Sequence, residues 1–293
     1  MRVHAIQTGT VTIRPTQREG QGRGAMRFVN IMLNRHWTEP LPIYAWVIDH
    51  PEGLIVVDTG ETARTATPGY FPVWHPYFRL GLQAHVRPDQ EIGPQLKTIG
   101  IHPNDVRWVV MTHLHTDHAG GLAHFPKSEI LVMRRAFEDA VGFPGKVRGF
   151  LPQRWPSWFA PKLVVLELQP FGPFPSSLRL TDAGDVVLIP TPGHTVAHIS
   201  VVLHDSDRTY FFAGDASYTQ QLMIEQKVDG VAPNEQEARR TLQRIDHFTQ
   251  ETPTVYLPSH DPQSGERLAN QTTVPHREQS GQIEAYARET SLS

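Results

Sequence analysis

Residues 113–118, with the sequence His-Leu-His-Thr-Asp-His, place four metal-ligand side chains within six positions. They directly follow residues 106–112, an apolar and β-branched segment that predicts a buried strand. Because residues two apart in an extended chain point to the same side, His113 and His115 project together from the end of that strand. The other two ligands come at the turn that follows, where the chain can swing back. Imidazole and carboxylate suit zinc, and also iron, cobalt or manganese, so the run predicts a metal site.

Cysteine is absent from all 293 residues, whereas histidine occurs 16 times. The absence excludes disulfides, thiolate nucleophiles and cysteine metal ligands. Structural zinc sites in small domains usually contain cysteine. A site made of histidine and aspartate therefore favours a catalytic metal over a structural one.

Three further ligand-type residues repeat the same placement. Each stands just beyond an apolar segment with strand character; the residues are His194, Asp215 and His260, and the segments are 186–190, 210–214 and 254–258. A lone histidine in such a place is more often structural. Three candidates that share one topology instead indicate a common site at one edge of the sheets.

Short apolar segments spread over the whole length predict an α/β fold with sheets covered by helices. The expected strands are 42–48, 54–57, 106–112, 130–133, 163–168, 186–190, 198–203, 209–213 and 254–257, and the expected helices are 134–141 and 235–248. Asn234 and Glu237 form a capping-box pattern at the start of the second helix. Residues 1–262 are expected to form a single domain, followed by a loose polar tail at 263–293.

Two segments rich in proline and aromatic residues, 65–90 and 143–162, interrupt the strands. Five of their aromatic residues are candidates for the wall of a substrate pocket: Phe71, Trp74, Phe150, Trp155 and Trp158. The alternative is that these side chains only pack beneath long loops.

Charge and hydropathy limit the partners. Net charge is −3 and no arginine-aromatic pattern is present, which argues against a nucleic-acid partner. No segment reaches about 18 apolar residues in succession, so we expect no membrane span, and the N-terminus lacks the apolar stretch of a signal peptide. These features predict a cytoplasmic protein that acts on a small molecule, either as a monomer or as a homodimer.

The order and spacing of the ligands resemble the metallo-β-lactamase superfamily. The matching elements are His113-x-His115-x-Asp117-His118, His194, Asp215 and His260, with Asp58-Thr59-Gly60 and the Thr-Pro-Gly-His-Thr loop at 191–195. The resemblance covers about residues 40–262 and implies an αββα sandwich, with metal ions in a cleft at the edge of the sheets. It implies two metal ions, one held by His113, His115 and His194, the other by Asp117, His118 and His260. Asp215 would bridge them, and Asp58 would orient ligands.

A second resemblance concerns the segment Asp215-Ala216-Ser217-Tyr218 together with Ser259-His260-Asp261. This pattern is similar to the N-acyl-homoserine lactonase group, as is the segment 134–140. The resemblance implies that Tyr218 contacts the substrate carbonyl and that the protein opens lactone rings, as in quorum quenching. His198, four residues after His194, is expected to support the site or pack near it, not to bind metal.

The expected mechanism is attack on a lactone carbonyl by a hydroxide that bridges two divalent ions, zinc first, with iron, cobalt or manganese as alternatives. Tyr218 would stabilise the developing oxyanion, and Asp117 would pass a proton to the leaving alkoxide. Three other interpretations stay open. They are a hydrolase for pyridoxolactone, aryl esters or phosphotriesters, a mono-iron persulfide dioxygenase, and a metal-binding protein without activity.

Overall fold

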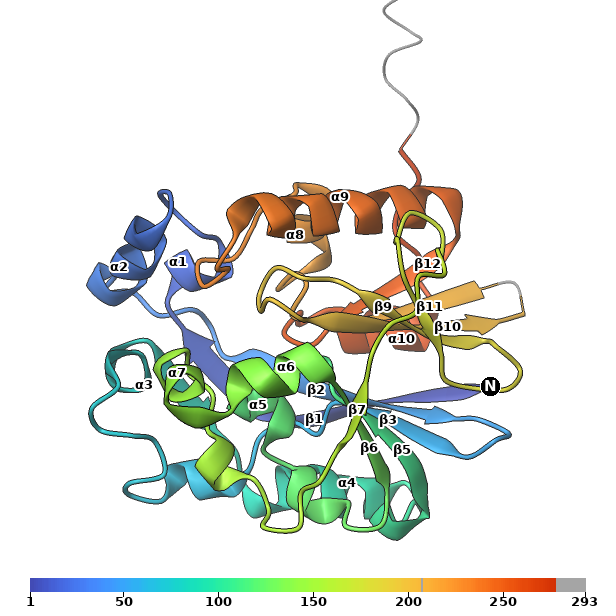
Figure 1. The fold of residues 1–293 in the computed structure, drawn as a ribbon, viewed down its shortest axis with the longest axis horizontal. Coiled ribbons are helices and arrows are strands. Elements are labelled where there is room, and N and C mark those ends of the chain that lie inside the picture. The colour runs from blue at the N-terminus through green and yellow to red at the C-terminus, as the bar shows by residue number, and fades with distance from the viewer. Residues whose placement is uncertain (207, 278–293) are drawn as a thin grey trace, which may run out of the picture.

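The computed structural model describes residues 1–206 and 208–277. Two β-sheets pack face to face, and helices cover the outer face of each sheet, as Figure 1 shows. This arrangement is the αββα sandwich expected from the sequence. Among the described residues, no helix is long and apolar enough to cross a membrane.

The first sheet has seven strands in the order β4-β1-β2-β3-β5-β6-β7. They are β1 (Arg2–Ile13), β2 (Leu41–Asp49), β3 (Leu54–Val57), β4 (Leu82–His85), β5 (Val106–Val110), β6 (Glu129–Met133) and β7 (Lys162–Val164). The four strands from β3 to β7 in that order run parallel. Because both faces of these strands are covered, their sequences are nearly continuous apolar runs.

The second sheet has five strands in the order β12-β11-β10-β9-β8. They are β8 (Leu178–Arg179), β9 (Val186–Pro190), β10 (Ile199–Asp205), β11 (Arg208–Gly214) and β12 (Thr254–Pro258). β11 and β12 are parallel, and the other neighbours are antiparallel. The parallel pair ends at the same edge, which brings the segments after β11 and β12 together.

Helices fill the outer layers. The α-helices are α1 (Pro15–Arg18), α2 (Ala25–Leu33), α3 (Pro76–Leu80), α4 (Ile92–Thr98), α5 (Thr116–Ala119), α6 (Arg134–Ala140), α7 (Gly142–Val147), α8 (Gln220–Ile224), α9 (Glu235–Glu251) and α10 (Ser264–Asn270). Short 3-10 helices lie at Ala63–Ala66, Pro88–Gln90, Pro103–Asp105, Leu122–His124 and Pro152–Arg154. The Asn234 side chain accepts from the backbone N–H groups of Gln236 and Glu237, which confirms it as the N-cap of α9.

The core consists of an apolar layer between the sheets and one outside each sheet. Between the sheets, side chains of both inner faces interdigitate, among them Trp46, Val57, Val110, Leu188 and Phe212. Outside the second sheet, the apolar side chains of α9 are buried against the sheet; they are Ala238, Leu242, Ile245 and Phe248. These layers hold the strands in place from both sides, and so determine where the residues that follow each strand lie.

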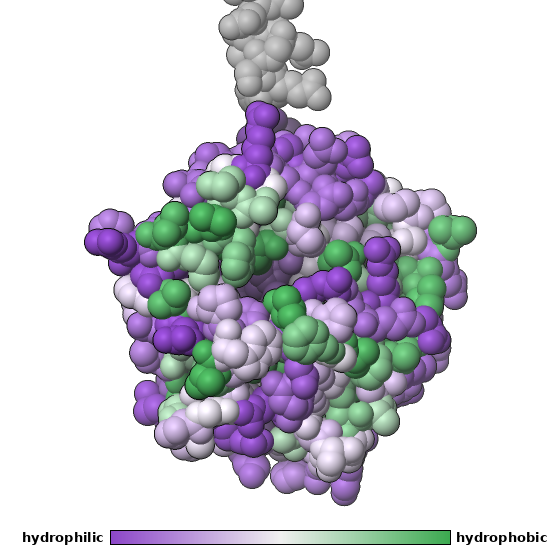
Figure 2. Space-filling view, turned by 60° about the vertical axis from the view of Figure 1, so that its left-hand side comes forward, coloured by the Kyte–Doolittle hydropathy of each residue, from purple (hydrophilic) through white to green (hydrophobic). Residues whose placement is uncertain are grey.

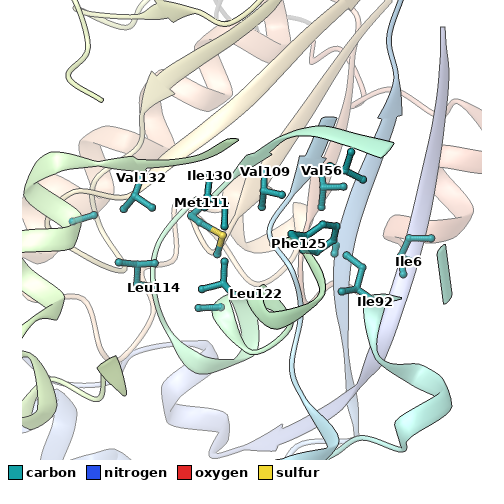
Figure 3. Packing of buried hydrophobic residues seen from close by; sticks show 14 of the residues in the cluster. Ile6, Val56, Ile92, Val109, Met111, Leu114, Leu122, Phe125, Ile130 and Val132 are labelled. Carbon is teal, nitrogen blue, oxygen red and sulfur yellow. The ribbon is translucent and has the colours of Figure 1, made fainter. Parts of the chain in front are cut away.

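The outer apolar layer of the first sheet includes a residue of the histidine run. Figure 3 shows side chains of β3, β5 and β6 meeting those of α4 and of the segment after α5. Val56, Val109 and Ile130 face Ile92, Leu122 and Phe125 in this layer. Leu114, from the middle of the histidine run, also points into it, which anchors the motif between its ligands.

Several segments differ from the sequence-based expectation, among them β4 and the helices α2 and α4, which were not expected. β1 was not expected, because glycine and polar residues interrupt it; its pairing with β2 shifts between Gln7 and Thr10, where Gly9 has a φ of 105°. The strand expected at 163–168 ends at Val164. The expected loop 143–162 includes most of α7, which follows α6 directly.

The expected loose tail is also wrong in its first part. Residues Ser264–Asn270 form α10, and the buried Arg267 side chain donates to the carbonyl oxygen of Tyr256 at 3.1 Å. A polar residue of this segment thus packs against the backbone of β12 and is not exposed to solvent. Residues 278–293 of the expected tail lie outside the described residues.

Candidate metal centre

The predicted ligands meet where strands of both sheets end. The histidine run begins three residues after the end of β5, and α5 turns the chain so that Asp117 and His118 come back toward His113. His194, Asp215 and His260 follow β9, β11 and β12. One edge of the sandwich therefore brings together ligand-type side chains from distant parts of the sequence.

The first cluster consists of three imidazoles, those of His113, His115 and His194. His115 Nδ1 lies 3.0 Å from His113 Nε2 and 3.0 Å from His194 Nε2. Nitrogen ligands of a tetrahedral zinc ion at 2.0–2.1 Å are separated by about 3.3 Å. The three nitrogens are thus close to the spacing that a shared metal ion requires.

The second cluster consists of Asp117, His118 and His260. Asp117 Oδ2 lies 3.4 Å from His260 Nε2, and Asp117 Oδ1 lies 4.0 Å from His118 Nε2. The two clusters differ in charge, because the first is made of imidazoles alone and the second includes a carboxylate.

The Asp215 carboxylate lies between the two clusters. Its Oδ2 is 3.4 Å from His194 Nε2 of the first cluster, and its Oδ1 is 3.2 Å from His118 Nε2 and 3.4 Å from His260 Nε2 of the second. Each oxygen thus faces a different cluster. The role of Asp215 as a bridge between two metal ions stays a prediction.

Two buried atoms of this centre lack hydrogen-bond partners within the described part of the chain. They are His118 Nε2 and Asp215 Oδ1, which lie 3.2 Å apart without the geometry of a hydrogen bond. A buried polar atom without a partner costs free energy, and a cation between these two atoms would satisfy both. The donor set of imidazole nitrogen and carboxylate oxygen fits divalent transition-metal ions.

Asp58 holds His118 from behind. Its backbone adopts a φ of 57°, which turns the carboxylate back toward the end of β5. Asp58 Oδ2 accepts from His118 Nδ1 at 2.8 Å, and Oδ1 accepts from the Thr112 backbone N–H at 2.8 Å. These contacts fix the ring so that Nε2 faces the centre; the role of Asp58 in orienting a metal-bound ligand stays a prediction.

Three other imidazoles, those of His113, His194 and His260, are fixed in the same way. The outward nitrogen of each lies near an oxygen: His113 Nδ1 is 3.1 Å from Thr112 Oγ1, His194 Nδ1 is 3.1 Å from Asp229 Oδ2, and His260 Nδ1 donates to the Pro42 carbonyl at 2.8 Å. Such contacts set the tautomer and the orientation of a metal-binding ring. Asp229 was missed by the sequence analysis, because it follows no strand and belongs to no recognisable motif.

His198 lies beside the ligands but in none of the candidate ligand groups. Its Nε2 accepts from the Asp215 backbone N–H at 3.0 Å, and its Nδ1 lies 2.9 Å from Thr191 Oγ1. Burial lowers the pKa of His198 to about 3, so the ring is neutral. It therefore supports the backbone of Asp215.

The electrostatics of the two clusters differ. Burial and the neighbouring His194 lower the pKa of His115 to about 3, and burial holds the pKa of His113 well below its ordinary value. Burial also opposes the charged form of His260, but Asp215 and Asp117 outweigh it and raise its pKa to about 10. His113 and His115 therefore offer neutral lone pairs. Burial opposes the charged form of His194, but Asp229 and Asp215 outweigh it and raise its pKa, so this ring, like the second cluster, attracts positive charge.

The sequence profile of the Metallo-beta-lactamase superfamily matches residues 38–260. The chain belongs to this superfamily. The metal-ligand set lies at the edge of its two sheets. It consists of the histidine run after β5, the ligands that follow other strands, and a carboxylate between two clusters.

Relatives support this assignment. A probable metallo-hydrolase of Mycobacterium tuberculosis is 34% identical over 182 residues; the match covers 59% of this chain and 56% of that protein, so it spans little more than half of the relative's length. The N-acyl homoserine lactonase AttM of Agrobacterium fabrum is 25% identical, with 89% of this chain and 94% of that one covered. A solved N-acyl homoserine lactone hydrolase with N-hexanoyl-L-homoserine at its metal centre has a TM-score of 0.72 at 20% identity, covering 90% and 94% of the two chains.

A pocket of about 450 Å³ opens above the metal-ligand set of this metallo-β-lactamase fold. Its floor includes His115, Asp117, His194 and Asp215, and its wall is mainly apolar, with Phe28, Phe78, Leu82, Val147, Phe150 and Val196. The wall comes from α2, α3, the start of β4, α7 with the segment after it, and the segment between β9 and β10. Figure 2 shows this side of the molecule, with a hollow near the centre and hydrophobic residues on both sides of it.

Among the five aromatic residues proposed for the wall, Phe150 lines the pocket, where its ring stacks 4.7 Å from that of His115. The other four do not line it. Phe71 stacks on Phe78 and Trp155 on Phe137, whereas Trp74 and Trp158 are largely exposed. This corrects the expectation for these four: long loops need an apolar core of their own, and Phe71 and Trp155 provide it.

Tyr218 lies beside the second cluster, and its contact with a substrate carbonyl stays a prediction. Its ring stacks on His260 with centroids 5.5 Å apart, and it lines the pocket. Its hydroxyl oxygen accepts from Gln17 Nε2 at 3.1 Å. Gln17 and Tyr77 also line the pocket and were missed, because they belong to short helices that only tertiary contacts bring to this edge.

Proposed function

We propose that the protein is a metal-dependent hydrolase that opens lactone rings, with N-acyl-homoserine lactones as substrates and quorum quenching as the outcome. The observation that carries the proposal is the position of Asp215. Its two oxygens face two separate ligand clusters at the floor of a pocket. A carboxylate shared in this way is suited to a pair of divalent ions.

Two metal ions, zinc by preference, would be held by His113, His115 and His194 on one side and by Asp117, His118 and His260 on the other, with Asp215 between them. When bound, such ions supply an acidified water as a nucleophile near neutral pH and polarise the ester carbonyl. The contact from Asp58 to His118 keeps the ring aimed at its ion.

Tyr218 supplies a hydrogen-bond donor at this floor. Burial, followed by the charge of Asp215, raises its pKa well above the ordinary value, so the phenol stays protonated. Since the oxygen accepts from Gln17, the O–H remains available to the carbonyl oxygen of the substrate. A donor at this position stabilises negative charge that develops on that oxygen during attack.

Asp117 is suited to handle the proton. It lines the pocket, and its side chain is 15% exposed, more than the 3% of Asp215. Burial alone would raise its pKa, but His118 and His260 lower it to about 2. Oδ1 or Oδ2 of Asp117 can therefore take a proton only briefly and pass it to the departing alkoxide oxygen.

The apolar wall supports an acyl substituent on the lactone. Phe28, Phe78 and Leu82 line it together with Val147 and Phe150. A relative that covers most of the chain is a lactonase for N-acyl homoserine lactones, and a solved neighbour holds N-hexanoyl-L-homoserine at its metal centre. Both favour this substrate class over other esters.

The test is a comparison of substrates on zinc-loaded protein. N-acyl-homoserine lactones with short, medium and long acyl chains are assayed beside an aryl ester and a phosphotriester. We expect kcat/KM for at least one lactone to exceed both competitors by about tenfold or more. Lactone turnover far below both competitors would contradict the proposal and favour a different ester substrate.

A further inference from the structure

Gln17 joins two tyrosines across the pocket. It lies in α1, and its side chain is only 3% exposed. Its Nε2 donates to the hydroxyl oxygen of Tyr77 at 2.8 Å and to that of Tyr218 at 3.1 Å. All three residues line the same pocket, although they come from three distant segments.

Both phenols keep their own protons. Each hydroxyl oxygen already accepts from Gln17, so each O–H is left to donate elsewhere. Burial raises the pKa of Tyr77, and the charge of Asp117 raises it further. The pocket therefore presents two neutral O–H donors, of which the proposed chemistry uses only that of Tyr218.

The two donors stand at different depths. The Tyr218 ring stacks on His260, at the metal-ligand floor. The Tyr77 ring instead packs in the loop cluster, 5.5 Å from Phe78 and 6.4 Å from His75. Tyr77 thus lies away from the reacting carbonyl, on the wall that holds the rest of the substrate.

The distance between the two phenol oxygens is limited by one shared atom, Gln17 Nε2. Because both phenol oxygens contact Gln17 Nε2, they are no more than about 6 Å apart. A lactone with an acylamino group on its α-carbon carries two carbonyl oxygens, one on the ring and one on the amide. Only the α-carbon and the amide nitrogen separate the two carbonyl carbons, so the two oxygens are within reach of both donors.

Apart from these two hydrogen bonds, the buried position of the Gln17 amide does not stabilise the fold. Its Oε1 is buried and has no partner among the described residues. An unpaired buried acceptor destabilises a fold, and an apolar side chain of similar size would fill the same space. The presence of an amide at this position is explained by the two tyrosine hydroxyls to which it donates.

We propose that Tyr77 is a substrate-binding residue that donates to the amide carbonyl of an N-acylamino lactone, and that Gln17 is the positioning residue that sets the distance between Tyr77 and Tyr218. This inference rests on the proposed lactonase function and adds a specific requirement to it. The acyl substituent must be attached through an amide, or another group with a carbonyl at that place. A plain alkyl lactone lacks the partner of Tyr77.

The test uses two substrates and three variants of the zinc-loaded protein. The substrates are an N-acyl-homoserine lactone and an α-alkyl lactone of equal chain length without the amide. The variants are Tyr77→Phe, Gln17→Met and, as a matched control, Tyr210→Phe. Tyr210, in β11, accepts from Gln271 Nε2 at 3.4 Å, a contact of the same kind, and it does not line the pocket. Metal content and unfolding temperature are measured for each variant.

We expect Tyr77→Phe to raise KM for the acylamino lactone by about tenfold with kcat nearly unchanged, and to leave both constants for the alkyl lactone unaltered. Gln17→Met should raise that same KM and also lower kcat for both lactones by about fivefold, because the Tyr218 hydroxyl loses its partner. Tyr210→Phe should change neither constant.

The outcomes separate the two proposals. If the wild-type protein hydrolyses neither lactone, the lactonase function fails and this inference fails with it. If the wild-type protein hydrolyses both lactones with similar kcat/KM, or Tyr77→Phe affects both equally, only the role of Tyr77 is overturned. The wild-type comparison needs no variant, so it decides the question even if Gln17→Met does not fold.

Discussion

The floor and the wall of the pocket are built in different ways. The metal-ligand set at the floor includes His113, His118 and His260, which are each at most 1% exposed and are held by contacts behind the ring. On the wall, Phe28 is 39% exposed and Val147 is 52% exposed, and both belong to short peripheral helices. The floor is thus preorganised by two sheets, whereas the wall depends on side-chain packing between loops.

This difference separates two kinds of substitution. A change on the floor should act through the metal ions and lower turnover of every substrate alike. A change on the wall should act through contacts with the acyl substituent of the lactone, and so change the turnover of only some substrates. Single substitutions in each region test this division, beginning with the largest expected effect.

Asp215→Asn should have the largest effect. The amide keeps the size of the side chain but cannot offer a negatively charged oxygen to each cluster. We expect metal content to fall and kcat/KM for every lactone to drop by about a thousandfold or more. Elemental analysis and the lactone assay measure both quantities.

Asp185→Asn is the control for that loss. Asp185 also lies beside a histidine, His50, at 3.1 Å, but away from the ligand set. It should retain metal and activity. Asp215→Asn protein with a full complement of metal and normal turnover would remove the bridging role.

Tyr218→Phe should come next, with a fall of about a hundredfold in kcat for all lactones. The change removes one hydroxyl donor and keeps the ring that stacks on His260. Metal content should stay at the wild-type level, which distinguishes this variant from changes at the ligands. Unchanged turnover would show that the substrate carbonyl does not use this hydroxyl.

Asp58→Asn should weaken metal binding by about 10- to 100-fold, as is typical when a residue that orients a metal ligand is lost. Asparagine tolerates the left-handed backbone of this position, where φ is 57°, so the fold should persist. Activity should return when excess metal is added, and a metal-concentration series measures this. A loss that no amount of metal restores would argue that Asp58 acts in the chemistry itself.

Phe150→Leu should have the smallest effect and the clearest substrate dependence. The ring lines the wall, so a smaller side chain should raise KM for long-chain lactones by about fivefold and barely affect short-chain ones. Steady-state kinetics over the chain-length series measures it. An equal effect at every chain length would mean that Phe150 acts through its stacking partner His115 instead.

The sequence predicted the floor much better than the wall. The ligands follow β5, β9, β11 and β12, and apolar runs in the sequence are enough to identify those strands. Alternation along an extended chain then tells which side chains point together. The sandwich itself followed from a family resemblance that those ligands carried.

Most residues of the pocket wall could not be predicted from the sequence, for a physical reason. Gln17 and Tyr218 are 201 positions apart, and their contact depends on how α1 packs against the rest of the fold. The short helices α1 and α3 have no apolar period long enough to detect. For the same reason, aromatic residues in a proline-rich loop could be assigned to the loop but not to the pocket side or the outer side of it.

The most direct test of the central claim is a metal titration of the apoprotein. Chelated protein is supplied with zinc in steps, while bound metal and hydrolysis of an N-acyl-homoserine lactone are measured on the same samples. We expect activity to rise and saturate at two zinc ions per chain, with Asp215→Asn falling short of that ratio. Full activity at one ion per chain, or activity that requires iron and consumes oxygen, would contradict the two-metal centre.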